Sequence, residues 1–98
     1  MMHVMHTKIA VMRFALTPAQ SRAGRALLEW TQADLARAAM VGLSTVRGFE
    51  LGTRAPIPNN IKAMREALEQ AGVEFIENGA VPATPGGVGA RLRDVLPV

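Results

Sequence analysis

The apolar positions between residues 30 and 52 recur every three to four residues, which predicts two short helices joined by a tight turn. The first of these helices has an apolar face made of Leu35, Ala36 and Ala39. The second has an inner face made of Gly42, Val46 and Phe49, with Val41 at the corner between the helices. The small alanines would let the second helix approach closely, so this pair is expected to organise the rest of the chain.

The opposite face of the second helix carries Leu43, Ser44, Arg47 and Gly48. A short, basic face with small residues suits a helix that enters a DNA major groove. Arg47 is the leading candidate for reading a base, because an arginine can bind guanine through two parallel hydrogen bonds. The alternative is an ordinary surface arginine that pairs with Glu50 or Glu29.

Capping signals predict where the first two helices begin. Thr17, Pro18 and Gln20 form a T-x-x-Q capping box with proline at the first helical position, and Thr31 with Asp34 forms a second box. The inward stripe of the first helix is predicted to be Ala23, Ala26, Leu27 and Trp30. The residues of that helix predicted to face water are Arg22, Arg25 and Glu29.

A loop with two prolines at residues 51–60 precedes the next predicted helix, which covers about residues 61–71. Its expected N-cap is Asn59 or Asn60. Its expected apolar stripe is Ile61, Met64, Ala67, Leu68 and Ala71. Gly52 and Gly72 are predicted to end the helices before them. Alternation then predicts strands at residues 73–78 and 90–95, and therefore a β-hairpin, which is marginal alone and must pack on the helices or a partner subunit.

Several of these positions together resemble the Cro/cI-type (XRE-like) helix-turn-helix transcriptional regulators. The matching positions are Gln32, Leu35 and Ala36 (Q-x-x-L-A), Val41, Ser44–Val46 (S-T-V), Phe49, Glu50 and Gly52 (F-E-x-G), and Arg54, Pro56, Pro58, Asn59 and Asn60 in the loop. The resemblance implies a mainly α, compact four-helix, phage-repressor-like domain with a small C-terminal β-hairpin. It also implies sequence-specific binding of double-stranded DNA by a transcriptional regulator, with repression as the expected mode.

The chain is expected to have three parts. Residues 1–16 are expected to be an N-terminal arm, partly disordered. Residues 17–72 are expected to be the helix-turn-helix DNA-binding domain, and residues 73–98 a hairpin extension with a mobile loop. Glu50 is expected to play a structural role, pairing with an arginine such as Arg54.

The expected DNA-binding residues are Gln32, Leu43, Ser44, Thr45, Arg47, Thr53, Arg54 and Asn59. In the family the glutamine that matches Gln32 often reaches a phosphate or supports the recognition helix. Thr45 lies between the core rim and the phosphates, and the loop residues Thr53, Arg54 and Asn59 are expected along the DNA backbone. Leu43 stands where the family usually has a polar residue, and a leucine there can contact a thymine methyl.

Two further positions depart from the family pattern. Met40 stands where glycine is usual, in a turn position that commonly takes positive φ, at a cost on the order of 1 kcal/mol for a residue with a Cβ. Gly42 replaces the usual serine cap, which glycine can tolerate. Together with Leu43, these departures favour an alternative function: an antitoxin-like or accessory module whose main surface binds another protein.

Composition narrows the functional classes. With 98 residues, 49% of them hydrophobic, the chain is expected to form one domain with a modest core. A net charge of +3 suits an anionic partner. The absence of cysteine excludes disulfides and thiol metal sites and suits the cytoplasm.

His3 and His6 alone make a poor metal site, so no metal or cofactor is expected. No catalytic constellation or membrane segment is recognised. One short recognition helix reads few bases, so a homodimer is expected.

Overall fold

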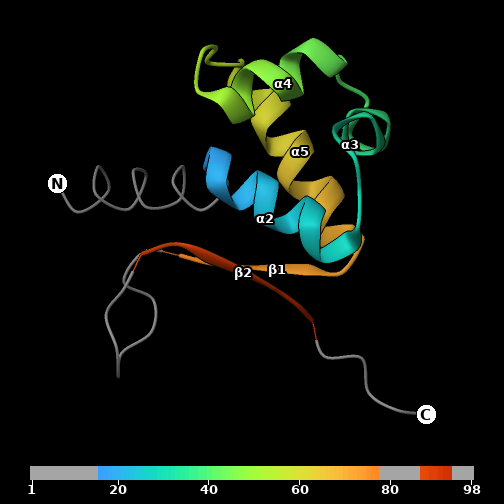
Figure 1. Cartoon of the computed structure of the whole chain (residues 1–98), viewed down its shortest axis with the longest axis vertical. Helices are drawn as coiled ribbons and strands as arrows, with labels where there is room; N and C mark the ends of the chain where they lie inside the picture. Colours follow the sequence, from blue (N-terminus) through green and yellow to red (C-terminus); the bar gives the residue numbers. More distant parts are fainter. Residues whose placement is uncertain (1–15, 78–86, 94–98) are drawn as a thin grey trace, which may run out of the picture.

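The computed structural model describes residues 16–77 and 87–93. This part of the chain forms α2 (Pro18–Leu28), α3 (Gln32–Ala39), α4 (Leu43–Leu51), α5 (Pro58–Gln70), β1 (Val73–Ile76) and β2 (Gly89–Leu92). The two strands form an antiparallel hairpin beneath α2 and α5, on the opposite side of the molecule from α4 (Figure 1). The prediction of a mainly α fold with four helices and a small C-terminal hairpin is confirmed. None of the described helices is long and apolar enough to cross a membrane.

The first two helices begin at the predicted capping boxes. Thr17 Oγ1 accepts from the backbone N–H of Gln20, and Gln20 Oε1 accepts from the backbone N–H of Thr17, both at 3.0 Å. Thr31 and Asp34 repeat this reciprocal arrangement at 3.0 and 2.9 Å. Each box satisfies two backbone N–H groups that the helix itself leaves without partners, and a good N-cap is worth about 1 kcal/mol.

Three helices end in a residue with left-handed backbone geometry. Gly52 ends α4 as predicted, with φ of 78°. Glu29 and Met40 end α2 and α3 with φ of 58° each. Met40 therefore has the positive φ expected of it, and its side chain is 91% exposed. The steric cost of this conformation is therefore not offset by packing.

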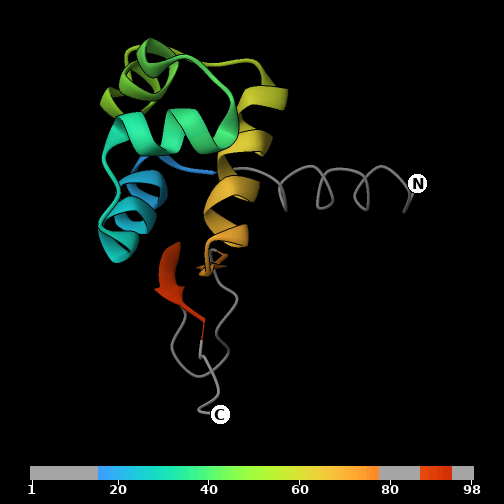
Figure 2. The same ribbon diagram turned by 90° about the vertical axis from the view of Figure 1, so that its right-hand side faces the viewer.

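The core lies where α3, α4 and α5 meet. Leu35, Val46, Met64 and Leu68 are completely buried. Ala36, Ala39 and Phe49 complete the buried faces of α3 and α4, so the predicted inner faces are confirmed except at Gly42, which is exposed and precedes α4 as its N-cap. Each fully buried large apolar side chain contributes about 1.5–3 kcal/mol. The view in Figure 2 shows α3 and α4 stacked against the upper part of α5, which extends down to the hairpin.

The inward face predicted for α2 is wrong. Ala23, Ala26 and Leu27 are exposed and Trp30 is only half-buried, whereas the buried residues of α2 are Gln20, Ser21 and Gly24. The helix is rotated because its inner face forms side-chain hydrogen bonds with other elements and also packs against them. Gly24 lets α2 lie close to α5 and β1, since a Cβ there would meet Leu68 at 3.3 Å and Phe75 at 3.5 Å.

The boundaries of α5 also differ from the prediction. The helix begins at Pro58 with Ile57 as its N-cap, so Asn59 and Asn60 lie within its first turn and cap nothing. Proline at the first helical position explains the earlier start, because its fixed φ suits that position. Met64, Ala67 and Leu68 are buried as predicted, whereas Ala71 is exposed at the C-cap and Gly72 follows with φ of 115°.

The hairpin pairs Val73 with Leu92 and Ile76 with Gly89 at its two ends. Val73 and Phe75 point into the core, whereas Glu74 pairs with Arg91 on the outer side. β1 ends at Ile76 and β2 at Leu92, and the described residues Glu77 and Arg93 are not in strands, so both strands end earlier than predicted. The rest of the two predicted strands, at residues 78 and 94–95, lies outside the described residues. The predicted arm also lies outside them, except for Leu16, which is 5% exposed and belongs to the core.

Candidate nucleic-acid interface

The turn between α3 and α4 sets the angle at which α4 is presented. Met40 ends α3, Val41 packs against the core, and Gly42 precedes α4 in an extended conformation. Val41 donates its backbone N–H to the carbonyl of Ala36 at 3.0 Å. Gly42 supplies no side-chain cap, so the first turn of α4 has free N–H groups that can face an anion.

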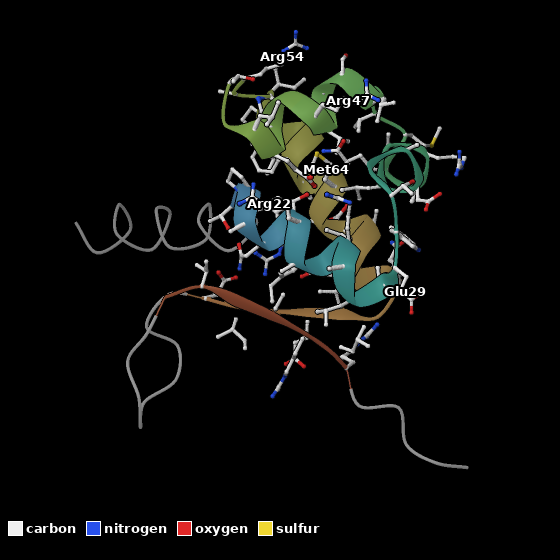
Figure 3. The ribbon with its side chains drawn as sticks, viewed as in Figure 1. Arg22, Glu29, Arg47, Arg54 and Met64 are labelled. Atoms are coloured by element: carbon white, nitrogen blue, oxygen red, sulfur yellow. The ribbon has the colours of Figure 1, made fainter. Side chains whose placement is uncertain are left out.

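The outer face of α4 is open. Ser44, Arg47 and Leu51 are exposed, and Leu43 is half-buried with its side chain against the core. Arg47 projects from α4 on the side of the molecule away from the hairpin (Figure 3). Among the described residues Arg47 pairs with neither Glu50 nor Glu29, so the alternative of a surface ion pair with either residue does not apply here.

Glu50, one helical turn beyond Arg47, faces α2 and is only 4% exposed. Its carboxylate accepts from Arg25 Nε at 2.9 Å, from Arg25 Nη2 at 2.7 Å, and from the hydroxyl of Ser21. The expected structural role of Glu50 in a pair with an arginine is confirmed, but the partner is Arg25, so the suggestion of Arg54 is wrong. Arg54 is on the loop after α4, on the exposed side, whereas Glu50 points inward to α2.

The pKa of Glu50 reflects this arrangement. Burial acts to raise the pKa, but hydrogen bonds from Arg25, Ser21 and Gln32 and the charge of Arg25 outweigh it. The pKa of Glu50 therefore lies below its ordinary value, and the group is charged at neutral pH.

Arg22 and Arg25 were predicted to face water, but both also donate hydrogen bonds within the protein. Arg25 is half-buried and also donates to the carbonyl of Trp30 at 3.1 Å, while Arg22 is exposed but donates to the carbonyl of Glu50. The sequence offered a signal for this cluster that was missed. Ser21 and Arg25 are four residues apart and share a helix face, and a buried acid on the neighbouring helix requires such donors.

Gln32 links the first turn of α3 to this same carboxylate. Its amide Nε2 donates to Glu50 Oε1 at 3.0 Å, so it supports α4 from the N-terminal end of α3. The amide nitrogen carries a second hydrogen, which is a further hydrogen-bond donor in the first turn of α3. The geometry is compatible with a phosphate contact at the same residue.

The loop after α4 returns across its outer side. The backbone N–H groups of Thr53 and Arg54 both donate to the carbonyl of Gly48, at 3.0 and 3.2 Å. Thr53, Arg54 and Asn59 are exposed. Arg54 points away from the hairpin, on the same side as Arg47 (Figure 3). The structure thus places Thr53 and Arg54 beside Gly48 of α4, whereas Asn59 lies in the first turn of α5 and Thr45 is half-buried on the first turn of α4.

Comparison with known families agrees with this geometry. A family model described as helix-turn-helix matches residues 22–75, which include α3, the turn and α4. Because the match covers more than half of the chain, the protein belongs to the XRE, or Cro/cI-type, helix-turn-helix family of DNA-binding regulators. A search of the curated proteins finds no match.

Proposed function

We propose that the protein binds specific sites on double-stranded DNA with α4 in the major groove and represses transcription from them. The observation that carries this proposal is the division of α4 into two sides. One side is fixed to α2 and α3 through buried Glu50, and the other presents exposed Ser44 and Arg47. A rigidly held helix with an open basic face is the arrangement that reads base edges.

Each predicted contact residue has a role in this proposal. Arg47 would bind guanine, and Leu43 and Ser44 would contact neighbouring bases from the first turn of α4. The proposal assigns phosphate contacts on either side to Gln32, Thr45, Thr53, Arg54 and Asn59. Phosphate contacts fix the orientation of the protein on DNA, whereas base contacts select the sequence.

We also propose a homodimer. Each mismatched base pair costs about 1–3 kcal/mol, so one α4 selects a site poorly in a genome. Two copies would place their recognition helices about 34 Å apart on an inverted repeat. On the hairpin, Phe75 is covered within the protomer, whereas Leu92 on β2 is 47% exposed and would be the apolar residue available for this contact.

A second candidate is the protein-interaction module. It is favoured by Met40 and Leu51, apolar side chains that are 91% and 76% exposed at the two ends of the segment from the turn through α4. In this function the same surface would bind a protein partner in place of DNA.

The direct test is selection of binding sites from random duplex DNA, followed by affinity measurement at several salt concentrations. DNA from upstream of the gene should be included among the targets. The proposal expects a selected inverted repeat bound at least about a thousandfold more tightly than unrelated DNA. Failure to enrich any sequence, with only weak salt-dependent binding, would overturn it and favour the protein partner.

A further inference from the structure

We infer that Arg54 is a base-reading, specificity-determining residue that takes the place of the missing side chain at Gly48 on α4. This inference rests on the proposed function and changes the role of Arg54 from a phosphate contact to a base contact. Gly48 is the positioning residue that makes this possible.

The space beside Gly48 is already filled by Arg54. A Cβ added to Gly48 would lie 2.8 Å from the Cβ of Arg54, 3.4 Å from its Cδ and 3.6 Å from its Nε. The first distance is shorter than real Cβ contacts allow, and the atom in the way is the rigid base of the Arg54 side chain. The stem of Arg54 therefore lies against α4 in the space that a side chain at position 48 would occupy.

The backbone holds Arg54 in this place. Gly52 turns the chain back with φ of 78°, and the N–H groups of Thr53 and Arg54 then both donate to the carbonyl of Gly48. A loop residue that is tied to the helix by its own backbone is nearly as well placed as a helical residue. This matters because readout of a base requires a fixed approach, whereas a phosphate tolerates a flexible one.

Gly48 also lies on the side of α4 that carries the proposed base contacts. Arg47 and Gly48 are three and four residues beyond Ser44, so they lie on either side of Ser44 one turn further along the outer side of the helix. The side chains of α4 supply one guanidinium to that face, from Arg47. Arg54 adds a second, and within residues 16–77 and 87–93 no carboxylate pairs with it. Figure 3 shows both arginines on this side.

The first experiment compares Arg54→Ala and Arg54→Lys with the unchanged protein on its selected site and on every single-base variant of that site. Loss of a bidentate arginine–guanine contact should weaken binding to the best site by about 5-fold to 150-fold and abolish the preference at one base pair. Arg54→Lys should not restore that preference, because an ammonium cannot form the planar fork. Arg91→Ala, which removes one positive charge from the hairpin on the other side, is the matched control and should leave binding nearly unchanged.

The second experiment moves Arg54 without removing it. Gly48→Ala should relax the preference at the same base pair, because the new methyl group displaces the stem of Arg54. Adding Arg54→Ala to Gly48→Ala should then cause little further loss. Circular dichroism and thermal melting establish whether each variant is folded. If Gly48→Ala is not folded, Arg54→Lys alone tests the inference.

The outcomes distinguish a failure of the inference about Arg54 from a failure of the proposed DNA-binding function. If Arg54→Ala weakens all sequences equally and lowers the salt slope by about one, while Arg54→Lys restores binding, Arg54 contacts a phosphate and the inference is overturned. If the unchanged protein itself selects no sequence, the proposed function fails instead, and the inference falls with it.

Discussion

Arg25 on α2 and Glu50 on α4 form a two-pronged ion pair, with Nε–Oε2 and Nη2–Oε1 distances of 2.9 and 2.7 Å. The side chain of Glu50 is 2% exposed and that of Arg25 is 17% exposed. The pair fixes the inner side of the recognition helix to the first helix of the domain. The carboxylate of Glu50 also accepts hydrogen bonds from the side chains of Ser21 and Gln32, so side chains from three helices meet at one charged group.

Removing one member of this pair should be costly. Glu50→Ala leaves the guanidinium of Arg25 half-buried without its partner, and we expect a loss of about 3–5 kcal/mol in the free energy of unfolding. Glu50→Gln should cost less, because the amide keeps the shape and some of the hydrogen bonds. Urea unfolding at pH 7 measures both. Arg91→Ala, which breaks the exposed pair with Glu74, is the control and should cost below about 1 kcal/mol. Equal effects of Glu50→Ala and the control would contradict the structural role.

The same carboxylate should make stability depend on pH. Because the pKa of Glu50 is lowered in the folded protein, its contribution is fully present above the ordinary value of 4.5 and is lost as the pH falls through the lowered pKa. We therefore expect a constant melting temperature near neutral pH and a progressive fall below about pH 4.5. Asp34, whose pKa is lowered chiefly by the backbone N–H of Thr31, acts in the same direction. Glu50→Gln should flatten this fall, and an unchanged profile would assign the acid sensitivity to other carboxylates.

Met40 offers a stabilising substitution. Its backbone is left-handed and its side chain is almost fully exposed, so glycine removes steric strain without removing packing. The change should be neutral or stabilise by up to about 1 kcal/mol. Thermal melting of Met40→Gly measures this, with Met40→Ala as the control that keeps the Cβ and should gain nothing. A marked loss of stability in Met40→Gly would show that the side chain packs in solution.

Phe49 tests the inner face of α4. It is 6% exposed within the core that also contains Leu35, so Phe49→Ala should cost about 3–5 kcal/mol. That is a large share of the total for a small domain, about 5–15 kcal/mol. Leu51→Ala is the matched control on the open side of the same helix, where 76% exposure predicts a small effect. Urea unfolding of the two variants should therefore give clearly different midpoints.

Arg47 tests the outer face. Arg47→Ala should weaken binding to the selected site by roughly 1–3 kcal/mol, with a smaller effect on unrelated DNA. Fluorescence anisotropy at fixed salt measures both affinities. Equal losses on both DNAs would make Arg47 a phosphate contact, and no loss on either would remove it from the interface.

Dimer formation is tested separately by sedimentation at micromolar protein concentration, with and without the selected DNA. The proposal expects two protomers on one inverted repeat. A monomer under both conditions, bound to a single half-site without symmetry, would contradict it.

Local signals in the sequence were enough to place most of the fold. The capping boxes at Thr17 and Thr31 and the terminal Gly52 depend on neighbouring residues, so the sequence defines them directly. The spacing of Leu35, Val46 and Phe49 likewise identifies the inner faces of α3 and α4. The left-handed geometry at Met40 followed from its place in the motif.

The errors arose where distant residues decide the outcome. The apolar residues Ala23 and Leu27 suggested one inward face for α2, but Glu50 and the hairpin impose another, which Ser21 and Gly24 occupy. The partner of Glu50 was misassigned to Arg54 because only the assembled helices bring Arg25 to it. The closeness of Gly48 and Arg54 is likewise a property of the folded loop.

The side chain of Gln20 does more than cap α2. Its amide Nε2 donates to the carbonyl of Ile76 at 3.4 Å and to that of Gly89 at 3.2 Å, and these two residues face each other across the hairpin. A slip of one residue between the strands would separate the two carbonyls and turn the buried Phe75 side chain toward water. One glutamine at the start of the first described helix therefore selects the alignment of two strands that follow more than fifty residues later.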